Sequence, residues 1–71
     1  MNAEQLEKIT FINGELNAAL RHMEIDVRRV RACQSGEETV VTVERGNGKT
    51  FNFDASNLTL KQTAIYILKR V

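Results

Sequence analysis

The fold is decided by two short stretches of the sequence, Thr39-Val40-Val41-Thr42-Val43 and Thr50-Phe51-Asn52-Phe53. The first stretch is rich in β-branched residues, and the second alternates apolar with polar side chains, so both are typical of β-strands. Between them lies Gly46-Asn47-Gly48, which consists of residues that tight turns prefer. The region therefore predicts a β-hairpin.

The length of the hairpin loop decides which side chains lie opposite each other. A two-residue turn would place Val43 opposite the polar Asn52, whereas a three-residue loop places it opposite Phe51. The same three-residue loop sets Val41 opposite Phe53, and one face of the hairpin becomes apolar. We predict the three-residue loop because that apolar face can close against helices.

Helices are predicted on both sides of the hairpin. Apolar residues recur at helical spacing from Leu6 to Met23 and again from Leu58 to Val71. Asn2 and Thr59 are each followed three residues later by glutamine, which is the spacing of a capping box. Gly14 is expected to lie inside the first helix, at a cost of about 1 kcal/mol relative to alanine.

Residues 24–33, between the first helix and the hairpin, have two interpretations. Apolar residues alternate over 23–27 and, with the opposite parity, over 30–32, and a bulge near Arg28-Arg29 would bring both sets to one face of a strand. Alternatively, a heptad pattern continues the first helix to about residue 34. The strand is the favoured interpretation, because the longer helix would carry a second apolar stripe on its solvated side.

These elements predict a single small α+β domain over residues 1–71, with the order α-β-β-β-α. The strands form a three-stranded antiparallel meander, and the two helices pack on one face of it. The alternative fold has a long N-terminal helix to about residue 34, followed by the β-hairpin and the C-terminal helix.

The composition leaves few ways to reinforce so small a core. A chain of 71 residues buries only about 60% of its unfolded surface. The one cysteine, Cys33, cannot form an internal disulfide, and Cys33 with the one histidine, His22, cannot supply the four ligands of a zinc site. We therefore expect reinforcement by association, either as a homodimer or with a protein partner.

Charge and hydropathy predict a cytoplasmic protein. The net charge is +1, which gives no general attraction to nucleic acid or to an anionic membrane. No apolar run approaches the roughly 18 residues that a membrane-spanning helix needs. The N-terminus is polar and acidic, unlike a secretory signal.

No motif predicts an enzyme, a cofactor or a bound metal. Gly48-Lys49-Thr50 matches the end of a phosphate-binding P-loop, but Val43 stands where that motif needs a glycine, and a strand follows. His22 and Cys33 lack a third residue that would orient them for nucleophilic catalysis. We expect Cys33 to be a small core residue and His22 to lie at a helix end.

The C-terminal helix is the first candidate for a binding surface. Its apolar surface is broader than one helix face can bury, and such an excess commonly marks a protein interface. We expect a non-enzymatic interaction module that self-associates or binds a protein partner through this helix and a sheet edge. The size and composition of the chain would suit an accessory protein of a phage or mobile element. The candidate interface residues are Ile65, Tyr66, Ile67 and Leu68.

Basic residues define an alternative, in which the protein binds nucleic acid weakly. Arginines suit contacts with phosphates, although charges at the first strand would equally protect a sheet edge from pairing. The order α-β-β-β-α is similar to that of the double-stranded-RNA-binding domain, but residues 60–63 contain one lysine where that family has a basic run. The candidate nucleic-acid contacts are Arg28, Arg29, Arg31, Lys49 and Lys61.

Overall fold

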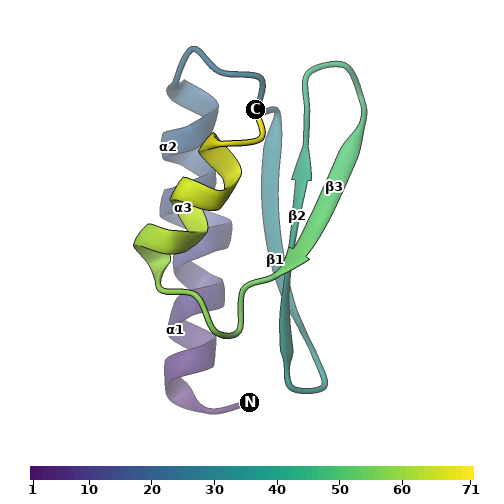
Figure 1. Ribbon diagram of the computed structural model, residues 1–71. Coiled ribbons are helices and arrows are strands. Elements are labelled where there is room, and N and C mark those ends of the chain that lie inside the picture. The colour runs from purple at the N-terminus through teal and green to yellow at the C-terminus, as the bar shows by residue number, and fades with distance from the viewer.

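The computed structural model describes all 71 residues, and Figure 1 shows a layer of helices beside a three-stranded antiparallel sheet. The element order is α-β-β-β-α, as predicted, and the N-terminal helical region ends at His22, so the alternative with a helix to residue 34 is wrong. In chain order the elements are α1 (Ala3–Phe11), η1 (Ile12–Leu16), α2 (Asn17–His22), β1 (Arg29–Ser35), β2 (Glu38–Glu44), β3 (Thr50–Asp54) and α3 (Leu60–Leu68).

The first three elements form one continuous helical rod. Its start is capped as predicted, because the Asn2 side chain accepts a hydrogen bond from Gln5 N at 2.8 Å and the Gln5 side chain accepts one from Asn2 N at 2.9 Å. The middle turn, η1, is π-helical and contains Gly14. Such a turn is wider than an α-helical turn and changes the direction in which the side chains around it point.

The connection from the helix to the sheet is irregular, so the predicted strand begins too early in the sequence. Met23 to Arg28 lie outside β1, and no bulge at Arg28-Arg29 is needed to bury Val27. The physical reason is Asp26, whose carboxylate accepts hydrogen bonds from Arg45 Nε at 2.9 Å and from Gly46 N at 2.8 Å. These bonds hold the connection against the end of the hairpin, so residues 23–28 do not extend β1.

The hairpin has the predicted register. Val43 lies opposite Phe51 and Val41 opposite Phe53, and the three-residue loop is closed by a 2.8 Å hydrogen bond from Arg45 N to Lys49 O. Gly48 adopts a φ of 85°, which glycine reaches without the strain that a side chain would introduce. β1 pairs with the other side of β2, so β2 is the central strand.

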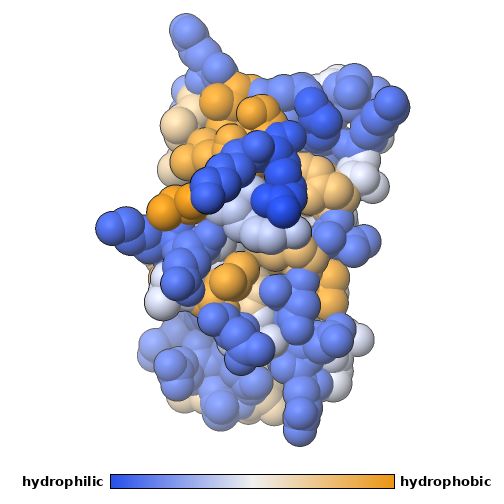
Figure 2. Space-filling model, in the orientation of Figure 1, coloured by the Kyte–Doolittle hydropathy of each residue, from blue (hydrophilic) through white to orange (hydrophobic).

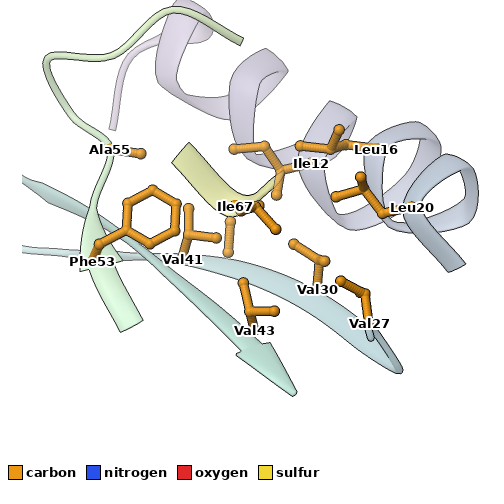
Figure 3. Close-up of a cluster of buried hydrophobic side chains, with 11 residues drawn as sticks. Ile12, Leu16, Leu20, Val27, Val30, Val41, Val43, Phe53, Ala55 and Ile67 are labelled. Atoms are coloured by element: carbon orange, nitrogen blue, oxygen red, sulfur yellow. The ribbon is translucent and has the colours of Figure 1, made fainter. Parts of the chain in front are cut away.

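The core lies between the two layers, where every buried apolar residue belongs to one cluster (Figure 3). The N-terminal helical rod contributes residues four apart, which share one face of a helix. The strands contribute alternate residues, which share one face of the sheet. The cluster consists of Ile12, Leu16, Leu20, Val27, Val30, Ala32, Val41, Val43, Phe53, Ala55 and Ile67.

Two asparagines of the helical rod close the outer edge of β1. Asn13 Oδ1 accepts a hydrogen bond from Ala32 N at 2.7 Å, and Asn13 Nδ2 donates one to Ala32 O at 2.9 Å. One helical turn later, Asn17 Oδ1 accepts a hydrogen bond from Val30 N at 2.8 Å. The distance between the two asparagines along the helix matches the distance between Val30 and Ala32 along the strand, because four helical residues rise about 6 Å and two strand residues advance about 6.6 Å.

Replacing Asn13 should therefore destabilise the fold more than replacing Asn17. We expect Asn13→Ala to lower the free energy of unfolding by about 2 kcal/mol, because it removes the partners of both backbone groups of Ala32, and Asn17→Ala by about 1 kcal/mol. Urea denaturation measures both values. The control is Asn57→Ala, since Asn57 is exposed in a turn. An Asn13→Ala variant as stable as this control would contradict the role given to Asn13 at the edge of β1.

Candidate protein interface

The outer edge of β3 is open, in contrast to that of β1. Hydrogen bonds from Arg45 N to Lys49 O and from Ala55 N to Thr39 O, each 2.8 Å long, show that the odd-numbered residues at both ends of β3 bond to β2. Because antiparallel bonding alternates along a strand, the even-numbered residues direct their N–H and C=O groups away from the sheet. These edge residues are Thr50, Asn52 and Asp54.

Helix α3 packs over the inner face of β3 and leaves its edge free (Figure 1). A capping box starts the helix as predicted, with the Thr59 side chain accepting a hydrogen bond from Gln62 N at 3.1 Å. Thr63 is fully buried, and its hydroxyl donates to Thr59 O at 2.8 Å. Thr63 and Ile67 lie four residues apart and therefore share one face of α3. Both are buried, so this face of the helix is the one that packs against the core.

The structure separates the four apolar candidates on α3 into three environments. Ile67 is fully buried in the core, so its side chain presents no surface to a partner. Ile65 and Leu68 remain 41% and 38% exposed. Tyr66 is half-buried on the side of α3 that faces β3. The surface that α3 offers is therefore narrower than the run of four residues predicts.

An aromatic row lies beside the open edge. The ring centroids of Phe51 and Phe53 are 6.4 Å apart, and Phe53 stacks on Tyr66 at 3.9 Å. The Arg70 guanidinium lies 3.4 Å above the Tyr66 ring, in position for a cation–π contact. Phe51 and Tyr66 are both half-buried, so each ring keeps part of its surface in solvent.

Sequence reasoning identified only part of this aromatic row. Tyr66 is among the predicted interface residues, whereas Phe51 is predicted on the apolar face of the hairpin and nothing in the sequence singles out Arg70. Their proximity depends on how α3 crosses β3, which no local pattern in the sequence specifies. The alternation of Phe51 and Phe53 along one strand is the sequence feature that indicates an aromatic row.

Apolar and charged side chains alternate over the face that carries α3. Figure 2 shows orange apolar areas separated by blue side chains on this face, without one continuous apolar patch. On the N-terminal helical rod and its end, Leu6, Phe11 and Met23 are also exposed.

Asp54 ends β3 and organises the turn that leads to α3. Its carboxylate accepts hydrogen bonds from Ser56 N at 2.9 Å and from Thr39 N at 3.3 Å. The bonds from Ser56, with smaller contributions from Thr39 N and the Lys8 charge, hold the pKa of Asp54 below its ordinary value. Lys8 Nζ also donates to Leu58 O at 2.5 Å, and to Ala55 O. The same loop is thus tied to both the sheet and α1.

The candidate nucleic-acid contacts are not brought together on one surface. Arg29 and Arg31 project from the outer face of the sheet, because they alternate with buried residues of β1. Lys61 belongs to α3, which packs on the inner face, and Lys49 lies at the end of the hairpin. Arg28 lies 3.4 Å from the Glu44 carboxylate, which offsets its charge.

The structure does not bring His22 and Cys33 together. His22 is in the last turn of α2, as expected. Cys33 follows Ala32, which bonds to Asn13, and His22 lies roughly 13 Å further along the helix axis than Asn13. Cys33 is exposed on the outer face, so its assignment to the core is wrong. The strand parity is the reason, since Cys33 alternates with the buried Ala32.

The structure contains neither a metal-binding group of side chains nor a membrane-spanning helix, and the chain has no match among known proteins. No three His, Cys, Asp or Glu side chains are grouped so that they could hold a metal ion. None of the helices has both the length and the apolar character that crossing a membrane requires. Comparison with known proteins finds no matching family model, no matching curated sequence and no matching solved structure.

The lowered pKa of Asp54 predicts a pH dependence of stability. A carboxylate with a depressed pKa in the folded state stabilises the fold above its unfolded pKa of about 3.9, and this stabilisation is lost as the pH falls through the folded pKa. Below about pH 4, the free energy of unfolding should therefore fall more steeply for the wild type than for Asp54→Asn.

Urea denaturation at a series of acidic pH values tests this expectation. The control is Glu37→Gln, which removes an exposed carboxylate in the β1–β2 turn and should leave the slope of the wild type unchanged. Equal slopes for the wild type and Asp54→Asn would contradict the role given to Asp54.

Proposed function

We propose that this chain is a non-enzymatic protein-interaction module that binds through the open edge of β3 and the adjoining surface of α3. The observation that carries the proposal is the difference between the two sheet edges. Asn13 and Asn17 bond the N–H of Val30 and both backbone groups of Ala32 at the middle of the β1 edge, whereas the outward-facing groups of Thr50, Asn52 and Asp54 face solvent. An open edge is a template for the addition of another strand.

The side chains beside this edge support the same proposal. Aromatic residues and arginine are enriched at the positions of protein interfaces that contribute most to affinity. Phe51, Tyr66 and Arg70 are three such residues, and they lie next to the edge with part of their surface in solvent. Backbone pairing would supply affinity, and these side chains would supply specificity.

The exposed apolar residues of α3 form the outer part of the proposed surface. Ile65 and Leu68 lie one helical turn apart, so both can contact one partner. We also assign this function to the cytoplasm, where the exposed Cys33 would stay reduced.

A proline in the middle of β3 tests the proposed surface. Asn52 directs its N–H to solvent, so Asn52→Pro removes that donor without removing a bond of the sheet, and edge strands tolerate proline. The matched control is Asn52→Thr, which keeps the N–H group and has a good strand propensity. Circular dichroism establishes that both variants are folded.

Affinity capture from a lysate of the host, with and without nuclease, gives the readout. We expect the wild type and Asn52→Thr to retain the same protein partner after nuclease treatment, and Asn52→Pro to lose it. Equal retention by Asn52→Pro would contradict the proposal, as would a wild type that retains neither another protein nor a second copy of this chain. Material that disappears with nuclease would instead support nucleic-acid binding by the basic residues.

A further inference from the structure

The geometry of β3 points to a second copy of this chain as the partner: we propose a symmetric dimer in which two β3 strands pair antiparallel about a two-fold axis at Asn52. The inference rests on the proposed function, because it uses the same open edge. Each sheet has three strands with β3 at one end, and pairing at β3 would join the two sheets into one.

The register follows from the bonding pattern of the free edge. In an antiparallel pair, residues that face the new neighbour lie opposite one another and exchange both hydrogen bonds. With the axis at Asn52, this residue lies opposite the partner's Asn52, and Thr50 lies opposite the partner's Asp54. All five residues of β3 are then paired, and the backbone groups that face solvent in the single chain are all used.

Side chains on both faces of the new strand pair are complementary in this register. On the inner face Phe51 lies opposite the partner's Phe53, so the half-exposed Phe51 ring gains an aromatic neighbour across the axis. On the outer face the Thr50 hydroxyl can donate to the partner's Asp54 carboxylate. A shift of the axis to Asp54 would instead set two carboxylates opposite each other, which is unfavourable.

The closed edge of β1 determines that association stops at two copies. If β3 of one copy could pair with β1 of the next, the contact would be head-to-tail and could continue into a filament. Asn13 and Asn17 oppose this at the middle of the strand, because their amides already bond the outward-facing N–H of Val30 and both outward-facing groups of Ala32. Pairing of β3 with β3 uses free groups along the full length of both strands, and such an isologous contact closes on itself.

Light scattering over a series of protein concentrations tests the dimer. The wild type and Asn52→Thr should approach twice the mass of one chain as the concentration rises. Asn52→Pro removes one N–H donor from each copy and places a ring at the axis, so its dimerisation midpoint should move at least about tenfold higher in concentration. A wild type that stays monomeric throughout, or a dimer unaffected by Asn52→Pro, would overturn the inference.

A cysteine at the axis provides a test that does not depend on the proline variant. Residues directly opposite in a hydrogen-bonded pair have Cα atoms about 5.5 Å apart, which is within the range of a disulfide. The double variant Cys33→Ser/Asn52→Cys should therefore form a covalent dimer under mild oxidation. The wild type is the matched control, because Cys33 is also exposed on the sheet but lies on β1.

The pattern of cross-linking separates the outcomes. A dimer that is cross-linked through residue 52 and not through Cys33 supports the inference. Cross-linking through Cys33 alone would indicate that the outer sheet faces stack, and it would overturn the β3 pairing. A strictly monomeric chain whose capture of another protein is lost in Asn52→Pro would overturn the dimer and leave the proposed function standing.

Discussion

The N-terminal helical rod is fixed to the edge of the sheet by one contact, in which the side-chain amide of Asn13 bonds to both the N–H and the C=O of Ala32. An amide presents a donor and an acceptor side by side, as the backbone of a neighbouring strand would. Asn13 therefore takes the place of a fourth strand at this edge. Asn17 extends the contact along β1, and the π-helical turn between them sets the direction of both side chains.

Bonds between side chains and backbone also provide much of the reinforcement that so small a core needs. Lys8 bonds the loop between β3 and α3, and Asp26 bonds the end of the hairpin, so each connects segments far apart in the sequence. Each such bond contributes roughly 1 kcal/mol. The lack of a disulfide or a zinc site predicts that association reinforces the fold. These bonds provide a second means of reinforcement within the single chain. The case for association now depends on the open edge of β3.

The asymmetry between the two sheet edges connects the fold to the proposed function. Proteins usually protect sheet edges, because an exposed edge invites pairing with other chains. Here the amides of Asn13 and Asn17 cover the middle of the β1 edge, and the charges of Arg29 and Arg31 lie on the outer face rather than along that edge. The edge of β3 has no such cover and lies beside the aromatic row of Phe51, Phe53 and Tyr66. Strand pairing with another chain is therefore expected at the edge of β3 and not at that of β1.

The sequence by itself determined those features that depend on neighbouring residues. Both capping boxes follow from local spacing, and the pairing of Val43 with Phe51 follows from the loop length and the alternation of the hairpin. Only the tertiary structure decided where β1 begins, because the partners of Asp26 lie about twenty residues further along the chain. The same holds for the closed edge and the aromatic row. Asparagine, arginine and tyrosine suit many environments, and their roles here are set by which distant backbone group or ring the fold places within reach.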